Sequence, residues 1–326
     1  MQEALDFNEE DLIPHQEMVV TLSERGFVKR VPSKAYTLQH RGGKGIIGMV
    51  TREQDAVRFL VVADTHDNLL FFTNKGKVFS LKCYEIPADS SRIAKGMAVI
   101  NLFPIAEGER VTAVVDVSEF TSGGYLLMAT SRGEIKKTSV DSFSSVRSSG
   151  LIAMDLAQSD SLVAACLGTD QDDVILVTKK GQSIRFPLPN LRASLRASGG
   201  VRAIKLAADD QVIGMDIAQP DAFLLAVTVG GHGKLTPIKD YPRQHRAGSG
   251  VRTFKITEET GELAAARVVA QSQQLMIISA DGIITRTPVK EEDPRKGITI
   301  QGRSTQGVRL MKLAPGDSVV AIAAFE

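Results

Sequence analysis

Short apolar runs recur along the whole chain, and polar segments that contain glycine separate them. The first run of each group reads MVV, LLFF, LLMA, VILV, LLAV or LMII, and a Ser or Thr, two further residues and a Gly follow it. A second run of β-branched and cationic residues, such as KVFSL or QSIRFPL, comes directly afterwards. Two runs joined by a short glycine turn predict a β-hairpin, because tight hairpin turns need residues at positive φ.

The turns themselves are regularly spaced. Five of them run from Ser or Thr to a Gly three residues later: Ser23 to Gly26, Thr73 to Gly76, Thr130 to Gly133, Thr178 to Gly181 and Ser279 to Gly282. We interpret the remaining turn, VTVGGHG, as a variant in which two extra residues follow Thr228 and the turn ends at Gly233. A constant period of about fifty residues indicates an array of equivalent units.

A second motif, an Arg followed four residues later by a Gly, has the same period, and we call it the Arg–Gly motif. Its regular copies are Arg41 to Gly45, Arg92 to Gly96, Arg196 to Gly200, Arg246 to Gly250 and Arg303 to Gly307. In the remaining, third copy the Arg is one place late, so that Arg147 precedes Gly150 by three residues. A third apolar run, such as GLIAMDL or GVRTFKI, follows each Gly, and a fourth, such as RVTAVVDV, comes after it.

The pattern therefore predicts four strands in each unit and six units in the chain. Units of this length with four strands are typical of an all-β, propeller-like ring, whereas a β-helix has much shorter repeats. We expect residues 1–18 to be a lead-in or linker and residues 19–326 to form six four-stranded blades, the last strand ending at Phe325. A ring of repeats also suits a chain of 326 residues, because each unit mainly contacts its neighbours.

Charge is strongly segregated along the chain, although the net charge is only +1. Six windows run from each hairpin turn through the next Arg–Gly motif: residues 25–45, 75–96, 130–150, 179–205, 232–255 and 285–312. They hold 35 of the 39 Lys and Arg residues but 8 of the 38 Asp and Glu residues. Equivalent windows of a ring lie at equivalent places, so we expect a basic belt around the rim and acidic residues on another face. A continuous basic stripe is the footprint of a polyanion.

The length and composition of the belt favour double-stranded DNA over other polyanions. A curved belt around six units would be far longer than a small phosphate ligand. Single-strand binders stack bases on aromatic side chains, but this chain has no Trp and 5% aromatic residues in total. Contacts from Lys and Arg to phosphate would bind duplex without regard to sequence and would weaken as salt is added.

The sequence offers no clear catalytic, metal or cofactor site. The five histidines, His15, His40, His66, His232 and His245, are scattered without the spacing of metal ligands. The pair of His66 and Asp67 in THDN could be catalytic, but Asp and Asn favour turns, so we interpret THDN as the turn between two strands. We expect no catalytic residue, no metal and no cofactor.

The first copy of the Arg–Gly motif is the most elaborate, and it carries a resemblance to a known family. Three glycines and two cations in QHRGGKG allow a tight loop whose backbone N–H groups face an anion, although a plain glycine turn is an equally good interpretation of the composition. The segment resembles the box Gln-Arg-Arg-Gly-Gly-Lys-Gly of the C-terminal domain of DNA gyrase A. The flanking EDLIPHQEMVVTLSERGFVKR and THDNLLFFTNKGKVF are also similar to that family. His40 departs from the box, because the family usually has Arg there.

The resemblance extends from about residue 11 to 325, and it implies both a fold and a function. The fold would be a β-pinwheel, in which neighbouring blades exchange strands. The domain would wrap duplex DNA around its rim with a fixed handedness and support ATP-dependent negative supercoiling by the intact enzyme, a type IIA DNA topoisomerase. The box would be needed for this wrapping, and it would also hold the first blade against the last. The catalytic tyrosine and the ATPase would lie elsewhere, so this domain would not be an enzyme on its own.

The resemblance also implies partners and a location. The partners would be double-stranded DNA, the remainder of the gyrase A chain and gyrase B in the heterotetramer, with no membrane. The domain would be cytoplasmic, in bacteria, and associated with the nucleoid. The apolar runs are much shorter than the roughly 18 residues of a membrane helix.

We expect two groups of DNA-binding residues. The box comprises Gln39, His40, Arg41, Gly42, Gly43, Lys44 and Gly45. The basic rim comprises Lys29, Arg30, Arg92, Lys95, Lys136, Lys137, Lys179, Lys180, Arg196, Arg202, Arg246, Arg252, Arg303 and Arg309. We expect the third unit to hold DNA least tightly, because its Arg147 is displaced and its window contains four cations.

Three alternatives remain. The corresponding domain of topoisomerase IV generally lacks an intact box and often has fewer blades, so the six units and QHRGGKG argue against it. A propeller that serves as a protein-interaction scaffold predicts acids and bases mixed around the rim. A propeller hydrolase needs convergent acids at the centre of the ring, and no repeated acidic signature predicts them.

Overall fold

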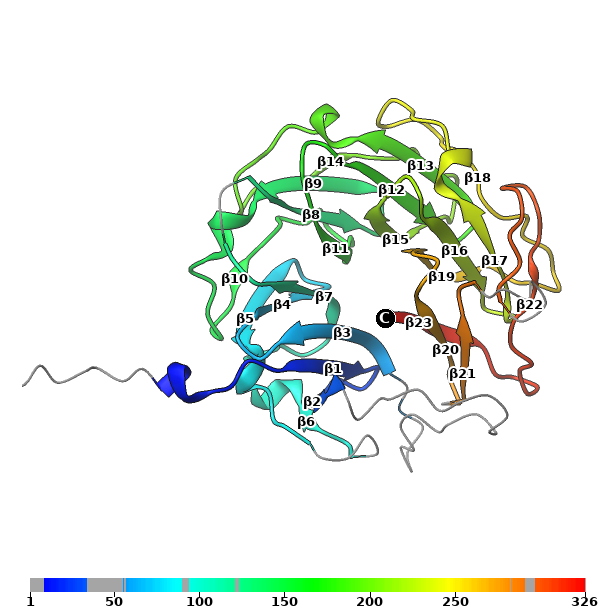
Figure 1. Cartoon of the computed structure of the whole chain (residues 1–326). Helices are drawn as coiled ribbons and strands as arrows, with labels where there is room; N and C mark the ends of the chain where they lie inside the picture. The colour runs from blue at the N-terminus through cyan, green and yellow to red at the C-terminus, as the bar shows by residue number, and fades with distance from the viewer. Residues whose placement is uncertain are drawn as a thin grey trace, which may run out of the picture.

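The computed structural model describes residues 9–33, 55, 57–89, 94–120, 123–281, 283–290 and 297–325. Within these ranges the chain forms six antiparallel sheets, which stand as blades around a ring (Figure 1). The remaining regular structure there consists of 3-10 helices of three or four residues. The prediction of an all-β, six-bladed ring is confirmed.

The first and second runs of each unit form the hairpin at the centre of a blade. The six hairpins are β1 (Glu17–Ser23) with β2 (Phe27–Pro32), β4 (Asn68–Thr73) with β5 (Lys77–Lys82), β8 (Tyr125–Thr130) with β9 (Glu134–Ser139), β12 (Asp173–Thr178) with β13 (Gln182–Pro187), β16 (Phe223–Thr228) with β17 (His232–Pro237), and β20 (Gln274–Ser279) with β21 (Ile284–Pro288). β1 begins two residues before the expected start of the ring at residue 19.

The Ser or Thr of each turn has a structural role that explains its recurrence. Its buried hydroxyl accepts a hydrogen bond from a backbone N–H across the turn, as Thr178 Oγ1 does from Gln182 N at 3.1 Å. The fifth turn follows the same rule, because His232 N donates to Thr228 Oγ1 at 3.1 Å and Gly231 has a φ of +80°. Our interpretation of this turn as a variant ending at Gly233 is therefore wrong. It is a regular turn from Thr228 to Gly231 without inserted residues.

The fourth run of each unit forms the strand nearest the centre. These inner strands are β3 (Val57–Asp64), β7 (Val111–Val117), β11 (Leu162–Gly168), β15 (Val212–Ile217), β19 (Leu263–Val269) and β23 (Val319–Phe325). Each lies against the next around the circle, and β23 lies against β3, so the inner strands close the ring (Figure 1). Apolar side chains seal this junction, with Val57 packed on Ile278 and Ala321, and Leu60 on Ala323.

The third run forms a short outer strand that belongs to the neighbouring blade. These outer strands are β6 (Met97–Ala98), β10 (Leu151–Ile152), β14 (Val201–Arg202), β18 (Val251–Arg252) and β22 (Val308–Arg309). They pair with β2, β5, β9, β13 and β17, which all come from the preceding unit. Neighbouring blades therefore exchange strands, as the resemblance implied. The sixth sheet, β21-β20-β23, has three strands among the described residues.

The glycine of the Arg–Gly motif marks the point of exchange. Gly250 has a φ of +74°, and a Cβ on it would lie 2.3 Å from the carbonyl oxygen of Ser183 in β13. Gly307 is equivalent, with a φ of +72° and 2.7 Å to the carbonyl oxygen of Gly233 in β17. Only a residue without a side chain can approach the neighbouring strand this closely. The recurring glycine is thus a requirement of strand exchange.

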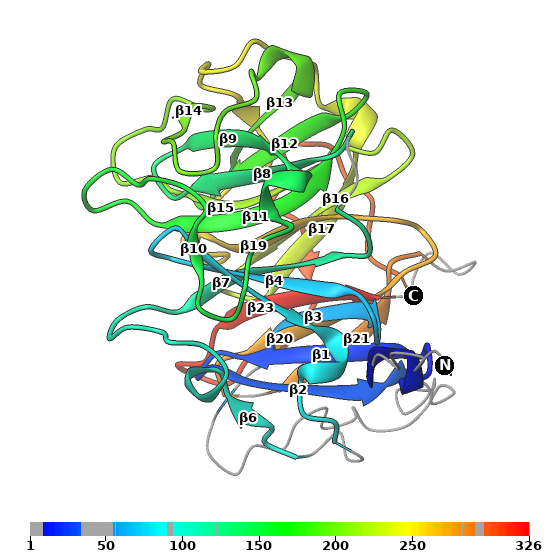
Figure 2. The same ribbon diagram turned by 90° about the vertical axis from the view of Figure 1, so that its left-hand side faces the viewer.

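Regular structure also occurs in the segment before the first blade. A short 3-10 helix, η1 (Glu9–Leu12), precedes β1 and lies outside the circle of blades (Figures 1 and 2). In the described part of the chain, no helix has the length and apolar character needed to cross a membrane.

Candidate nucleic-acid interface

The outer strands and the loops around them form a continuous edge on the outside of the ring. Backbone hydrogen bonds join the loops of successive units. Asp155 N donates to Ser198 O at 3.0 Å, Lys205 N to Gly248 O at 2.8 Å, and Lys255 N to Thr305 O at 2.9 Å. The labels of β10, β14, β18 and β22 follow this edge in Figure 1. Side chains on it are therefore held in a row by the backbone.

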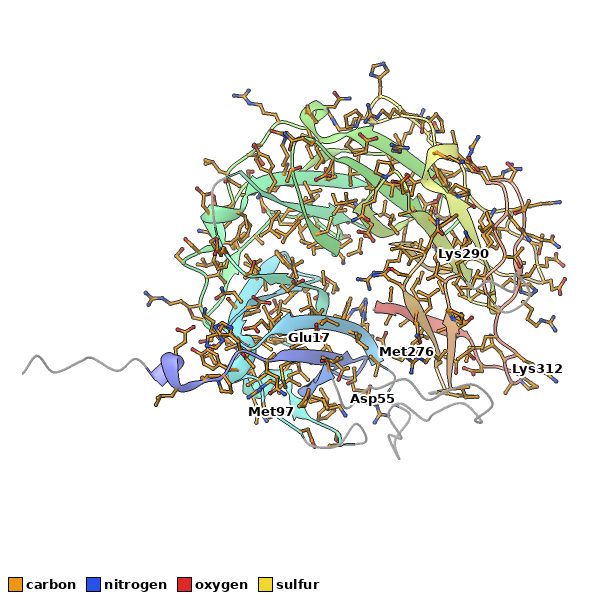
Figure 3. The ribbon with its side chains drawn as sticks, in the orientation of Figure 1. Glu17, Asp55, Met97, Met276, Lys290 and Lys312 are labelled. Carbon is orange, nitrogen blue, oxygen red and sulfur yellow. The ribbon has the colours of Figure 1, made fainter. Side chains whose placement is uncertain are left out.

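Six exposed cations lie on this edge at equivalent positions of the last three units. The second residue of each outer strand is an Arg, and the residue three places later is a Lys. Lys312 stands at the outer side of the molecule in Figure 3. We call these residues the rim cations: Arg202, Lys205, Arg252, Lys255, Arg309 and Lys312.

The second and third units lack this pair of cations. The equivalent residues are Ala98 and Asn101 in the second unit, and Ile152 and Asp155 in the third. The Ile152 side chain is 53% exposed where the later units present an Arg. In the described residues, the rim cations are thus concentrated on one part of the ring.

The arginines of the Arg–Gly motif brace the outer strand of the unit before them. Arg196 Nη1 donates to Ile152 O at 2.8 Å, and Arg303 Nη1 donates to Arg252 O at 3.3 Å. Arg246 Nη1 makes the same bond to Arg202 O. All three arginines are half-buried. A guanidinium has five N–H donors, so a side chain that uses one of them for bracing can still meet a phosphate.

Three lysines on the second hairpin strand have a different role. Lys29, Lys136 and Lys234 occupy the same position in β2, β9 and β17, and each is 1% exposed. Lys234 Nζ donates to the carbonyl oxygens of Gly302 at 2.6 Å and of Arg303 at 2.8 Å. Each ammonium thus binds the inside of the loop that carries the Arg–Gly motif of the following unit.

The other two lysines of this set bind in the same way. Lys29 Nζ donates to Ala94 O at 2.7 Å. Lys136 Nζ donates to Ala153 O at 2.8 Å, to Ser198 O at 2.9 Å and to Arg196 O. Burial, and then the charge of Arg196, lowers the pKa of Lys136 to about 8. Burial, and then Arg303, lowers the pKa of Lys234 to about 8 as well.

Two further cations join neighbouring blades. Lys137 is 4% exposed, and its Nζ binds Asp170 Oδ1 at 2.7 Å and Leu188 O at 3.1 Å. Arg30 is half-buried, and its guanidinium donates to Ile86 O at 2.6 Å and to Tyr84 O at 3.0 Å. Their side chains hold the loop of the next unit in place.

The structure therefore divides the expected rim residues into two sets. Lys29, Lys136 and Lys137 were expected on a DNA-facing surface, but they are buried because they bind backbone carbonyls or Asp170, and Arg30 is largely engaged in the same way. Those that are exposed or half-buried are Lys95, Lys179, Lys180, Arg196, Arg202, Arg246, Arg252, Arg303 and Arg309. The box, residues 39–45, and Arg92 lie outside the described residues.

Sequence reasoning missed half of the rim cations. Lys205, Lys255 and Lys312 lie within the basic windows, but they are not among the residues expected to bind DNA. The signal was present, because Gly-Val-Arg followed three residues later by Lys occurs in the fourth, fifth and sixth units. A comparison of equivalent positions in the repeated motif identifies these three lysines.

The THDN segment forms a turn, as expected. It connects β3 and β4, with Asp67 N donating to Asp64 O at 3.0 Å.

Tyr241 is buried, and its hydroxyl forms a hydrogen bond with Thr253 Oγ1. Burial raises the pKa of Tyr241 to about 12, which keeps this phenol neutral.

Comparison with protein families and with curated proteins gives a consistent result. The sequence model of the family described as "DNA gyrase C-terminal domain, beta-propeller" matches residues 17–64, 67–118, 124–165, 172–219, 222–270 and 273–326. DNA gyrase A of Dehalogenimonas lykanthroporepellens is 55% identical over 322 residues, which are 99% of this chain and 40% of that protein. DNA gyrase A of Escherichia coli is 38% identical over 97% of this chain and 35% of that protein. The chain thus spans well under half of these relatives.

Solved structures agree with the sequence comparisons. The structure of a DNA gyrase A C-terminal domain has a TM-score of 0.81 and 25% identity, and the match covers 95% of this chain and all of that one. The crystal structure of a DNA topoisomerase IV C-terminal domain has a TM-score of 0.74 and 21% identity, covering 96% of this chain and 94% of that one. The second likeness is one of fold alone.

Proposed function

Because this chain belongs to the family of DNA gyrase C-terminal, β-propeller domains, we propose that it binds duplex DNA along the outer edge of the ring and wraps it with a fixed handedness. The observation that carries this proposal is the row of rim cations on adjacent, hydrogen-bonded loops. A row of cations at equivalent positions of successive units suits the repeated phosphates of a duplex backbone. It carries no pattern of donors and acceptors for reading bases.

Bending the duplex around the edge has a cost that several contacts must offset. Smooth bending of a 20–30 bp site by 40–90° requires on the order of 1–6 kcal/mol. A single exposed ion pair contributes roughly 0.2–1 kcal/mol. The six rim cations together contribute roughly 1–6 kcal/mol and can offset the bending cost, whereas the two of one unit contribute roughly 0.4–2 kcal/mol and offset only its lower end. Wrapping therefore depends on the rim cations of several units acting together.

We expect duplex binding by this chain to depend steeply on salt and little on sequence. Because binding to phosphates releases counterions, log K should fall linearly with log salt concentration. Affinity for two duplexes of unrelated sequence, measured by fluorescence anisotropy between about 50 and 200 mM salt, checks this. Ligation of nicked circular DNA in the presence of the chain measures the wrap directly, since a chiral wrap changes the linking number. Flat salt dependence, or an unchanged linking number, would contradict the proposal.

The box is proposed as a specialised part of the same function. Changing Arg41 and Lys44 to Ala should reduce the linking-number shift more than the matched loss of two charges at Arg110 and Arg267, which are exposed and outside the basic windows. The reason is that the box sequence combines two cations with three glycines, a composition that allows a loop whose backbone N–H groups face an anion. Equal effects of the two double variants would remove the box from the site.

The proposal extends to the partners of the intact enzyme. As part of gyrase A, the domain would act with the remainder of that protein and with gyrase B, presenting wrapped DNA for ATP-dependent negative supercoiling. It would act in the bacterial cytoplasm, at the nucleoid, and the domain itself would supply no catalytic residue. The family match and the names of the relatives support these expectations.

A further inference from the structure

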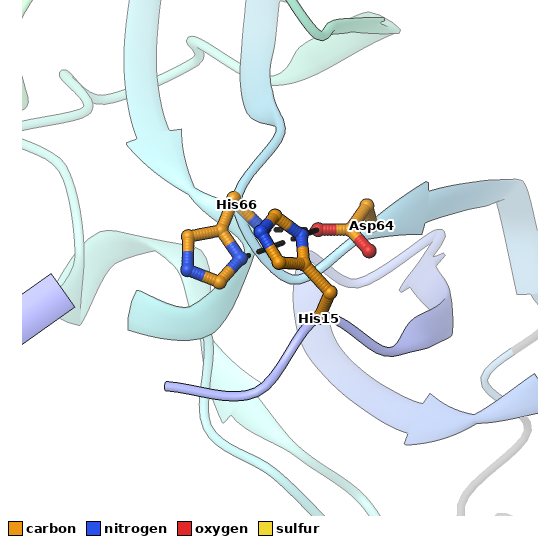
Figure 4. A group of neighbouring side chains, drawn as sticks. All are labelled: His15, Asp64 and His66. Carbon is orange, nitrogen blue, oxygen red and sulfur yellow. Dashed lines mark hydrogen bonds and ion pairs between the residues drawn. The ribbon is translucent and has the colours of Figure 1, made fainter. Parts of the chain in front are cut away.

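We propose that His15, Asp64 and His66 form a binding site for a divalent transition metal ion such as Zn²⁺. The three side chains come from the lead-in before β1 and from the turn between β3 and β4, and they point toward one another (Figure 4). One ligand atom of each lies within 4.8 Å of those of the other two. Two imidazoles and a carboxylate are a ligand set that zinc accepts in proteins. The long separation of His15 from the other two along the chain explains why sequence spacing did not reveal them.

In neutral His66, the lone pair of Nδ1 faces two oxygen atoms that are themselves hydrogen-bond acceptors. Its Nε2 lies 3.2 Å from Glu10 O, and a carbonyl can only accept, so Nε2 carries the proton. In the neutral ring, Nδ1 then has a lone pair. It faces Asp64 Oδ1 at 3.3 Å and Thr65 Oγ1 at 3.2 Å. The Thr65 hydroxyl already donates to Pro14 O at 2.8 Å.

A cation between these atoms resolves the conflict. A histidine that donates one ring N–H to a backbone carbonyl and offers the other nitrogen to a metal is the usual arrangement in metal sites. Protonation of His66 is the alternative, since an imidazolium would donate from both nitrogens. The two explanations differ in what binds, so they can be separated by experiment.

Two of the three distances between the ligand atoms are close to those of a metal site, and the third is within 4.8 Å. Zinc ligands lie at about 2.0–2.2 Å from the ion, so tetrahedral neighbours are roughly 3.3 Å apart. His66 Nδ1 and Asp64 Oδ1 are 3.3 Å apart, and His15 Nδ1 and Asp64 Oδ1 are 2.8 Å apart. The His15 side chain is 77% exposed, so it can move outward by the remaining fraction of an ångström at little cost. A water molecule would complete the coordination.

The position of the site gives it a structural consequence. Asp64 pairs with Glu17 at the start of β1, and Glu10 of η1 binds Lys82 Nζ at 3.1 Å. Lys82 lies in β5 of the second blade, so a metal held by His15 and His66 would add a further and stronger link between the lead-in and the turn that connects the first two blades. Metal binding would thus fix the direction in which the chain enters the ring.

Calorimetric titration of the chelator-treated, tag-free chain with ZnCl₂ at neutral pH tests the proposal. We expect one ion per chain, and a visible absorption spectrum of tetrahedral Co²⁺ when cobalt replaces zinc. His15→Ala should weaken Zn²⁺ binding at least tenfold, and its exposed position means that the change removes little packing. His66→Gln should do the same and should abolish the cobalt spectrum.

His245→Ala serves as the matched control, because His245 is exposed and lies outside the cluster. It should leave the Zn²⁺ affinity unchanged, and circular dichroism without metal checks that each variant is folded. Binding to the unaltered chain no tighter than to His15→Ala would overturn the proposal and leave a protonated His66 as the explanation. None of these measurements involves DNA, so the result is independent of the proposed wrapping.

Discussion

Changing Arg202, Arg252 and Arg309 together to Ala is expected to weaken duplex binding by one to two orders of magnitude. Each of these exposed arginines would contribute about 0.5–1 kcal/mol to a phosphate contact, which gives a sum of roughly 1.5–3 kcal/mol. Loss of three contacts should also reduce the slope of log K against log salt by about 3. Anisotropy titrations at several salt concentrations measure both quantities.

The matched control for this variant removes three cations that lie outside the basic windows. Arg58, Arg110 and Arg267 changed together to Ala produce the same loss of charge, and each lies on or next to an inner strand. We expect their effect on affinity to be several times smaller and the salt slope to remain unchanged. If the two triple variants behave alike, binding depends on net charge and the outer edge has no special role.

The reciprocal variant tests whether the third unit binds DNA weakly because it lacks the rim cations. Ile152→Arg with Asp155→Lys places the missing pair of rim cations on the third unit. Ile152 is exposed, so the change disturbs little packing. Tighter binding, with a steeper salt slope, is the expected result. This would also give a physical basis to the expectation that the third unit holds DNA least tightly.

The sequence contained most of the architecture because the repeat is strict. The Ser/Thr-to-Gly turn predicted every hairpin, since hydroxyl and glycine both have a fixed task in the turn. The interpretation of the fifth turn is wrong because Gly230, Gly231 and Gly233 offer competing ends, which the folded chain distinguishes by the bond from His232 N to Thr228 Oγ1 and by the positive φ of Gly231. Strand exchange followed from the family resemblance. The bare pattern does not say which hairpin a two-residue strand will join.

The candidate site was predicted less well, because a count of cations does not distinguish their roles. Lys136 and Lys137 are neighbours in a strand, yet both are buried, one under a loop and the other against the next blade. The arginines of the Arg–Gly motif donate a hydrogen bond to the preceding outer strand and remain partly exposed to solvent. The metal-site residues were invisible for a different reason, since only the fold brings the lead-in to the first inner turn.

A period of two units was present in the sequence and would have identified the buried lysines. At their position, the hairpin strands of the first, third and fifth blades have Lys29, Lys136 and Lys234, whereas the second and fourth have Phe79 and Ile184. A phenyl ring cannot replace an ammonium in a contact with phosphate, so this position is not a DNA-binding position common to all blades. The alternation predicts a buried position that supports the loop either by hydrogen bonds or by apolar packing.

Changing Lys234 to Met is accordingly expected to lower the free energy of unfolding by about 2 kcal/mol. The change removes the ammonium that binds the carbonyl oxygens of Gly302, Arg303 and Thr305, and hydrogen bonds to a charged group contribute roughly 1.5–3 kcal/mol. Urea unfolding followed by circular dichroism gives the value. Lys239→Met is the control, because Lys239 is exposed on the same segment, and it should change stability by less than about 0.5 kcal/mol.

The pH dependence of this difference tests the cause. The pKa of Lys234 is lowered from 10.5 to about 8 in the folded chain, mainly by burial. Between these values the unfolded chain binds more protons, so the stability of the unaltered chain should rise with pH relative to Lys234→Met, by at most about 1.4 kcal/mol per pH unit. Below about pH 8 the lysine is protonated in both states, and the difference should be constant. A stability advantage of the unaltered chain that shrinks as pH rises from about 8 to 10 would mean that the carbonyls favour the charged ammonium more than burial opposes it.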